Sequence, residues 1–162
     1  MPERYRLLAT LGAGLGLRQG ELFGLAVGDI DRQAGVVTVR RQVKIVGSRP
    51  VFAPPKNLKV RTVPLPKPVA QALAAHQLRY PPTPSTLPWR DVDGRDETAT
   101  LLVTSRELKP LNRNYFNGAV WHKALEAVGI EPSRQTGCTS CGTGTPPRCS
   151  RRGRRSRRSR NT

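Results

Sequence analysis

Three cysteines stand close together near the carboxyl end of this 162-residue chain: Cys138, Cys141 and Cys149. The Cys-x-x-Cys spacing of the first two is one that zinc sites use, because neighbouring thiolates can bind one tetrahedral ion. A closed structural zinc site needs four ligands, and no fourth cysteine or histidine follows in the chain. One Cys-x-x-Cys motif with a third cysteine therefore does not make a closed zinc site, and we predict that the chain holds no metal.

The segment around the cysteines is also strongly basic. Residues 134–162 contain nine arginines and no carboxylate, whereas residues 1–133 contain 19 basic and 11 acidic residues, a net charge of +8. The whole chain has a net charge of +17 and an isoelectric point near 11.4. Such an excess of positive charge indicates a polyanionic partner, most simply a nucleic acid.

The length of the chain suits one domain with a hydrophobic core, and hardly two. The first residues, MPERYRLLAT, are charged and contain no long apolar run, so we expect no signal peptide and no membrane span. Three crowded cysteines are too few for a disulfide framework. These features favour a cytoplasmic protein.

Hydrophobic periodicity predicts the helices that must position the basic residues. Leucines recur at helical spacing over residues 5–15, and the pattern restarts in a short helix that stops near Gly28. Residues 67–78 (KPVAQALAAHQL) and 112–129 (NRNYFNGAVWHKALEAVG) predict two further helices, the second ending on its last glycine. The proline-rich residues 80–99 are expected to form a loop.

Strand signals fill the middle of the chain. Residues 35–46 (GVVTVRRQVKIV) are β-branched and partly alternating, and residues 49–55 (RPVFAPP) and 60–66 (VRTVPLP) are two shorter candidates. We expect one antiparallel sheet of three strands, with the last two joined by a turn near residues 56–59 (KNLK). The predicted fold class is therefore α+β, mainly helical, with a small three-stranded antiparallel sheet.

Two short boxes carry a resemblance to a known family. Residues 16–22 form a Gly-Leu-Arg-x-x-Glu-Leu box, and Lys56 lies in a turn before an Arg-x-Val-Pro-Leu strand at residues 61–65. In this order and spacing, the boxes resemble the catalytic domain of phage integrases, the tyrosine-type site-specific recombinases. The resemblance covers roughly residues 3–133. It implies that residues 1–133 form a partial integrase catalytic domain, incomplete at its carboxyl end.

The resemblance also implies a partner and roles for individual residues. The partner is double-stranded DNA, with full-length integrase protomers as further partners, and the family uses no metal or other cofactor. Arg18 would bind the scissile phosphate, because a guanidinium suits phosphate oxygens, and Lys56 would protonate the departing oxygen as general acid. Glu21 would support the site, or serve equally as a structural ion-pair residue. Lys59 and Arg61 would add DNA contacts, with Lys59 as the alternative to Lys56, and DNA binding would place the protein at the nucleoid.

The family pattern continues with a His-x-x-Arg box and then a tyrosine nucleophile, and this chain has neither. Its tyrosines, Tyr5, Tyr80 and Tyr115, all precede the place where that box should begin. We therefore expect a chain that is truncated at both ends and inactive, because family chemistry depends on a covalent phosphotyrosine link. A non-catalytic basic protein that binds DNA or RNA is the alternative.

The basic tail has a genetic interpretation. When the codons from Gly137 onward are read from their third base, they permit His-x-Leu-Arg-His followed by Trp-Tyr, which is the missing box at the expected place. We interpret residues 134–162 as a disordered, arginine-rich frameshift product. An evolved nucleic-acid-binding arm is the alternative, and in either case nine arginines should bind phosphate.

Overall fold

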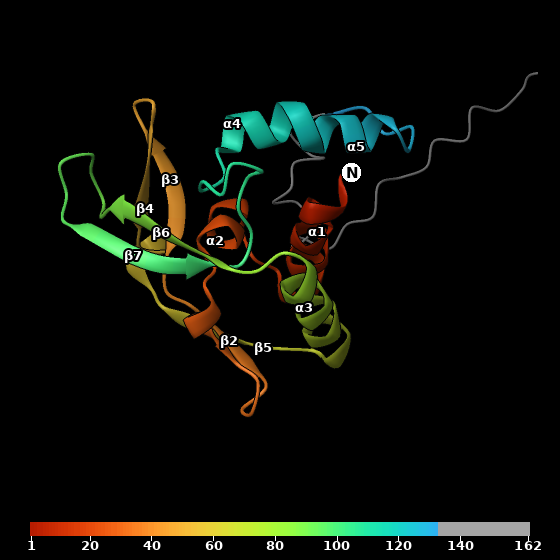
Figure 1. Ribbon diagram of the computed structural model, residues 1–162, viewed down its shortest axis with the longest axis horizontal. Coiled ribbons are helices and arrows are strands. Elements are labelled where there is room, and N and C mark those ends of the chain that lie inside the picture. The colour runs from red at the N-terminus through yellow and green to blue at the C-terminus, as the bar shows by residue number, and fades with distance from the viewer. Residues whose placement is uncertain (133–162) are drawn as a thin grey trace, which may run out of the picture.

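The computed structural model describes residues 1–132, in which two helices, a run of strands, a third helix, a strand pair and a last helix follow one another (Figure 1). The helices are α1 (Glu3–Leu15), α2 (Gln19–Gly24), α3 (Lys67–Arg79), α4 (Arg113–Phe116) and α5 (Lys123–Glu126). A π-helical segment, Asn117–His122, joins α4 and α5 into one continuous helix. Within the described residues, no helix is long and apolar enough to cross a membrane. The disordered tail and frameshift product predicted for residues 134–162 lie outside this range.

The leucine pattern that predicts α1 marks its buried face. Leu8 and Leu11 are almost fully buried, and α1 packs against α3. The helix ends where Gly16 adopts a left-handed backbone conformation, with φ of 62°, and donates its N–H to the Gly12 carbonyl oxygen at 3.1 Å. Glycine adopts this conformation without steric cost. The chain therefore turns directly from α1 into Arg18 and the start of α2.

The strands form three small antiparallel sheets. The strands are β1 (Ile30–Asp31), β2 (Val36–Val39), β3 (Gln42–Val46), β4 (Arg49–Ala53), β5 (Arg61–Pro64), β6 (Thr83–Pro88) and β7 (Asp96–Leu101). Strands β1, β2 and β5 form a three-stranded sheet in the order β1-β2-β5, while β3 pairs with β4 and β6 pairs with β7. With seven strands among residues 1–132, the expectation of a mainly helical fold is not confirmed.

The predicted pairing of the middle strands was wrong. The run over residues 35–46 is one strand in the prediction, but it breaks at Arg40 and Arg41 into β2 and β3. Strand β5 pairs with β2 and β4 pairs with β3, so the last two strands of the predicted sheet do not pair with each other. The register explains this outcome. Val39 pairs with Arg61 and Gln42 pairs with Ala53, so residues 54–60, between Ala53 and Arg61, lie outside both ladders.

The proline-rich residues 80–99, predicted to be a loop, contain the β6–β7 hairpin. Pro84 and Pro88 fit because β6 pairs on one side only, and proline is tolerated in a strand with a free edge. Ser85 and Leu87 alternate with the prolines and are buried. Burial of that alternating face outweighs the low strand propensity of proline.

Three aromatic rings join the helices in the core. The ring of Phe116 meets the ring of Tyr5 edge to face at 5.8 Å between centroids, and that of Phe23 at 5.3 Å. Such edge-to-face pairs are favourable beyond the area they bury. Because the three residues come from the carboxyl-terminal helix, α1 and α2, the cluster fixes α2 against both neighbours.

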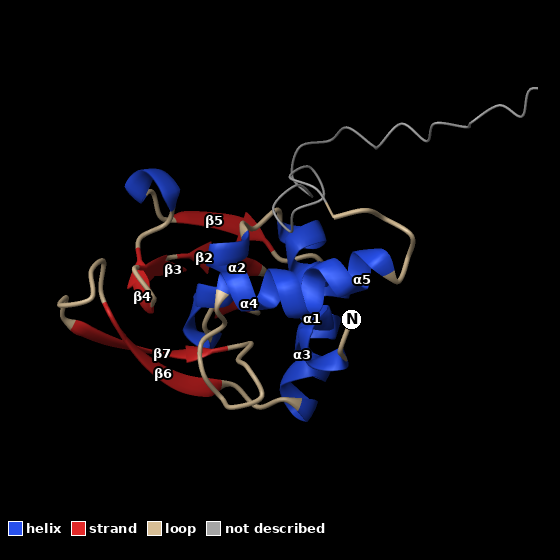
Figure 2. Ribbon diagram, turned by 90° about the horizontal axis from the view of Figure 1, so that it is seen from above, coloured by secondary structure: helices blue, strands red, loops and turns tan. Residues whose placement is uncertain are grey.

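Helix α2 lies between α1 and strand β3 and contacts both (Figure 2). Gly20 and Gly24 lie against β3: a Cβ added to Gly20 would stand 3.0 Å from the Val43 carbonyl oxygen, and one added to Gly24 would stand 3.0 Å from the Gln42 Cα. Larger residues at these positions would have to push the helix away from the strand. The position of α2 is therefore set by the backbone of β3.

His76, on α3, is a buried titratable group. Its side chain is buried, and within residues 1–132 its Nε2 atom has no hydrogen-bond partner. Burial lowers the pKa of His76 below its ordinary value of 6.5; a hydrogen bond with the Leu102 backbone opposes the shift, and the charge of Arg4 adds to it. The folded state thus resists protonation of this imidazole.

We expect the free energy of unfolding to fall as the pH drops below about 6.5, because His76 then takes up a proton more readily in the unfolded chain. Urea denaturation at a series of pH values between about 7.5 and 5 measures this slope. His76→Gln should flatten it, whereas His122→Gln, at the exposed second histidine, should leave it unchanged. Equal slopes for wild type and His76→Gln would contradict the expectation.

Candidate functional site: the Arg18–Glu21–Arg61 cluster

Arg18 stands at the amino-terminal boundary of α2, between the glycine that ends α1 and the helix itself. Its neighbour Leu17 is 3% exposed and anchors the backbone in the core, while the Arg18 side chain is 51% exposed. The sequence thus buries the residue before the arginine and leaves its guanidinium accessible to solvent.

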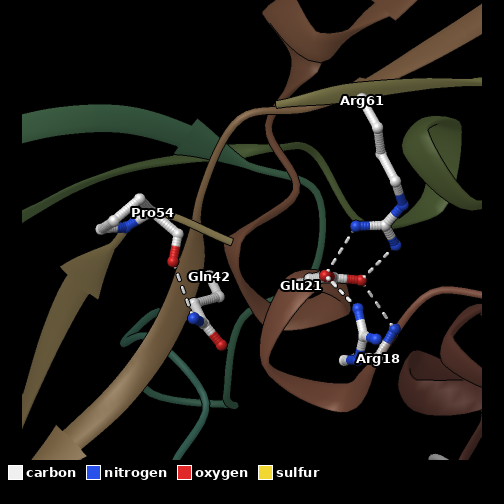
Figure 3. Close-up of polar contacts among 5 residues, drawn as sticks. All are labelled: Arg18, Glu21, Gln42, Pro54 and Arg61. Carbon is white, nitrogen blue, oxygen red and sulfur yellow. Dashed lines mark hydrogen bonds and ion pairs between the residues drawn. The ribbon is translucent and has the colours of Figure 1, made fainter. Parts of the chain in front are cut away.

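Glu21 is the centre of a polar cluster that also contains Arg18 and Arg61 (Figure 3). Its side chain is completely buried. The Arg18 backbone N–H donates to Glu21 Oε2 at 2.9 Å, and Arg18 Nη1 donates to Oε1 at 3.3 Å. From strand β5, Arg61 donates through Nη1 to Oε1 at 2.8 Å and through Nη2 to Oε2 at 2.7 Å. The buried carboxylate therefore receives a bidentate pair from Arg61 and caps the start of α2.

These contacts keep the cluster ionised. Burial alone raises the pKa of Glu21, but hydrogen bonds from Arg61 and Arg18 outweigh it and lower the pKa below the ordinary value of 4.5. The hydrogen bonds with Glu21 raise the pKa of Arg61, although the partial burial of Arg61 opposes this shift. Glu21 is thus a fixed negative charge near neutral pH, suited to hold arginines and unsuited to donate a proton.

Lys56 and Lys59 lie on the turn between β4 and β5. Lys56–Leu58 form one 3-10 turn, in which the Leu58 N–H donates to the Pro55 carbonyl oxygen at 2.9 Å. Both lysine side chains are exposed. Of the residues predicted for the site, the structure therefore joins the two arginines and the glutamate by direct contact, and it leaves both lysines exposed on the adjoining turn.

Sequence reasoning missed three residues that surround this site. Gln42, on β3, donates its side-chain Nε2 to the Pro54 carbonyl oxygen at 2.7 Å, directly after β4 and before the turn that carries Lys56 (Figure 3). Gln19 donates its Nε2 to Asn117 Oδ1 at 2.5 Å, linking α2 to the π-helical segment. A polar residue directly after Arg18 was a signal available for Gln19. Gln42 and Asn117 carry no such signal, because neither of them stands next to Arg18, Glu21 or Arg61 in the sequence.

No group of three or more histidine, cysteine, aspartate or glutamate side chains in residues 1–132 is arranged to hold a metal ion. The cysteines considered above lie outside the described range. Within that range, the polar chemistry of the site consists of guanidinium, ammonium, amide and one buried carboxylate group. Such a set binds anions through hydrogen bonds and positive charge.

Comparison with known proteins agrees with the resemblance that the two sequence boxes carry. Residues 1–138 match the phage integrase family, and the chain belongs to that family, as its two sequence boxes predicted. Over 125 residues it is 34% identical to the prophage integrase IntR of Escherichia coli K12, a match that covers 71% of this chain and 29% of the relative.

Solved structures show the same fold. The Tn1549 transposon integrase in complex with a circular intermediate DNA matches with a TM-score of 0.66 at 20% identity, and its complex with transposon right-end DNA matches with 0.65 at 22% identity. Each match covers 86% of this chain and 44% of the solved chain. The chain thus has the integrase catalytic fold and spans less than half the length of these relatives.

Proposed function

We propose that the described residues bind the scissile phosphate of double-stranded DNA, as part of the catalytic domain of a site-specific recombinase that integrates DNA. The arrangement at Arg18 carries this proposal, because the buried Glu21 holds its backbone while its guanidinium stays half exposed. Among the described residues, that guanidinium makes one protein hydrogen bond, through Nη1 at 3.3 Å. Its remaining N–H groups are available to phosphate oxygens.

The chemistry of strand cleavage suits the two proposed catalytic residues. Attack on a phosphodiester builds negative charge on the non-bridging oxygens, which a guanidinium such as that of Arg18 can stabilise with two hydrogen bonds. The departing oxygen needs a proton, and the exposed ammonium group of Lys56 can donate one. Glu21 acts indirectly, by fixing Arg18. Lys59, on the same turn as Lys56, adds a phosphate contact.

The relatives support the substrate class. The relative from Escherichia coli is a prophage integrase, and the Tn1549 integrase was solved with circular intermediate DNA and with transposon end DNA. A DNA duplex is therefore the proposed partner, with full-length integrase protomers as further partners at a recombination site. This assignment also accounts for the basic charge of the chain.

We propose that this chain alone does not form the phosphotyrosine link. Tyr5 is 4% exposed and packs against Phe116, so it cannot reach DNA without disrupting the core. Tyr80 lies at the end of α3 and Tyr115 on α4, and no His-x-x-Arg box follows either residue. The family match ends at residue 138, beside the place where the shifted frame would begin, which supports a frameshift origin for the tail.

The test of the proposed phosphate site is the DNA affinity of Arg18 variants. We expect Arg18→Ala to weaken binding to a labelled duplex by roughly tenfold to a hundredfold, because a charge-assisted contact is lost. The affinity of Arg18→Lys should lie between those of wild type and Arg18→Ala, since lysine keeps the charge and loses the bidentate geometry. Fluorescence anisotropy with the full chain, in the presence of excess unlabelled polyanion, measures the effect.

Arg6→Ala is the matched control, because Arg6 is an exposed arginine on α1 and its loss removes the same charge. Equal affinities for Arg6→Ala and Arg18→Ala would contradict the phosphate site. Equal affinity of the wild type for duplex RNA and duplex DNA would favour the general nucleic-acid-binding alternative.

A further inference from the structure

The turn that carries Lys56 leaves the sheets and returns at one place. It follows Ala53, the residue of β4 that pairs with Gln42, and it ends before Arg61, the residue of β5 that pairs with Val39. Its two ends therefore flank the break between β2 and β3. We call residues 54–60 the lysine turn.

The lysine turn has little structure of its own. A backbone hydrogen bond joins the Leu58 N–H to the Pro55 carbonyl oxygen, and Leu58 has a left-handed φ of 57°, which is uncommon for a residue with a side chain. The side chains of Leu58 and Val60 are 71% and 60% exposed, so these two side chains do not anchor the outer part of the turn in the core. The direction in which the turn projects Lys56 therefore depends on how its ends are held.

The entry end is held by Gln42. The Gln42 side chain donates to the carbonyl oxygen of Pro54 at 2.7 Å, one residue beyond its ladder partner Ala53 (Figure 3). The backbone of Gln42 is also the part of β3 against which Gly24 packs, with the glycine's projected Cβ 3.0 Å from the Gln42 Cα. One residue therefore connects the start of the lysine turn to α2.

The exit end is held by Arg61, directly after the turn. Both terminal nitrogens of Arg61 bind Glu21, and Glu21 in turn accepts the Arg18 backbone N–H. The pair spans 40 positions in sequence and is partly buried. The end of the turn and the amino-terminal boundary of α2 thus share one carboxylate.

We propose that Gln42 and Arg61 are positioning residues, which hold the two ends of the lysine turn against α2 and so set Lys56 relative to Arg18. The role of this arrangement at DNA rests on the proposed function, whereas the anchoring of the turn does not depend on it. Arg61 then acts on the site indirectly, by binding Glu21, because both of its terminal nitrogens donate hydrogen bonds to that carboxylate.

The experiment measures the order of the lysine turn in the full chain without DNA. In ¹⁵N-labelled protein, Arg61→Gln and Gln42→Ala should each raise the amide exchange rate of Leu58 by about tenfold or more and lower the order parameters of residues 56–60. Leu108 is the internal reference. The Leu108 N–H donates to the Ser105 carbonyl oxygen at 3.2 Å, and Leu108 has a φ of 59°. It therefore lies in a turn of similar geometry outside the site.

Arg41→Gln is the matched control variant. It removes the ion pair of Arg41 Nη1 with Asp29 Oδ2, at 2.8 Å, and a 3.4 Å hydrogen bond to the Gly24 carbonyl oxygen, while Gln42 and Arg61 keep their side chains. Leu58 should exchange faster in Arg61→Gln and Gln42→Ala alone, with Leu108 unchanged in all three variants. Equal effects on Leu58 and Leu108, or an equal effect of Arg41→Gln on Leu58, would show general loss of stability and overturn the inference.

DNA affinity separates this inference from the proposed function. Because Lys56 is then free to move, the Arg61→Lys variant should bind a duplex more weakly than wild type by a factor of about three to ten. Adding Lys56→Ala should reduce the DNA affinity of that variant by a smaller factor than it reduces the affinity of wild type. If Arg18→Ala weakens DNA binding but the turn stays ordered in the Arg61 variants, the anchoring is wrong and the phosphate site stands. If the turn loosens but Arg18→Ala binds DNA normally, the anchoring stands and the phosphate site is wrong.

Discussion

Glu21→Gln should destabilise the protein by about 2–3 kcal/mol, because it leaves the partly buried Arg61 without its counter-charge. The expected loss is smaller than for a fully buried ion pair, since the Arg61 side chain is 34% exposed and water can solvate it. Guanidinium denaturation of the full chain measures the change in the free energy of unfolding. Glu97→Gln, at an exposed carboxylate on β7, is the control and should change stability by less than about 0.5 kcal/mol.

The pH dependence of this variant gives a second measure. The pKa of Glu21 is lower in the folded state than its ordinary value of 4.5, so the charged carboxylate stabilises the fold above that pH. Its contribution is lost as the pH falls through the folded pKa. The difference in stability between wild type and Glu21→Gln should therefore shrink below about pH 4.5. A difference that persists unchanged into acid would mean that packing, rather than charge, carries the effect.

A chain that ends at Gly137 should bind duplex DNA far more weakly than the full chain at low salt. Removing residues 138–162 removes eight arginines. The log–log dependence of affinity on salt should lose roughly 0.9 in slope for each phosphate that these residues neutralise, and at about 50 mM salt the affinity should fall at least about a hundredfold. Anisotropy titrations at several salt concentrations measure both quantities.

A full-length variant with the same eight arginines replaced by glutamine is the control for this deletion. It keeps the length of the chain and removes only the charge, so it should reproduce the effect of the truncation. Thermal unfolding of the truncated chain checks that the domain remains folded. An unchanged salt slope would show that the first 137 residues supply the DNA contacts.

Local spacing was enough to predict the Arg18–Glu21 part of the site. Two residues three positions apart at a helix start meet through the geometry of one turn, and the observed hydrogen bonds follow from that geometry. The helices were equally accessible, because the leucine periodicity of α1 is a local pattern. The partner of Glu21 from β5 was not predictable in this way, since it lies 40 positions away and depends on the sheet register.

The sheet itself shows why register escapes sequence reasoning. Residues 35–46 carry one β-branched pattern, and nothing in it marks Arg40 and Arg41 as the break between two ladders. The β6–β7 hairpin was missed for a related reason. Pro84 and Pro88 lower the strand propensity of the segment, yet the buried face between them decides the outcome in the folded protein. If Arg18 and Lys56 serve one phosphate, their charged ends should lie within about 10–12 Å of each other, and this distance stays a prediction.

The break between β2 and β3 also determines which changes in chain length this protein can accommodate. Residues 54–60 stand outside both ladders, so an insertion or deletion among them would leave the pairing of Val39 with Arg61 and of Gln42 with Ala53 intact. A longer turn would carry its ammonium groups farther from the sheets, and a shorter one would draw them in, while the core is untouched. The length of the turn between its two anchors then sets the reach of the lysine, and evolution or design can adjust that length without rebuilding the sheets.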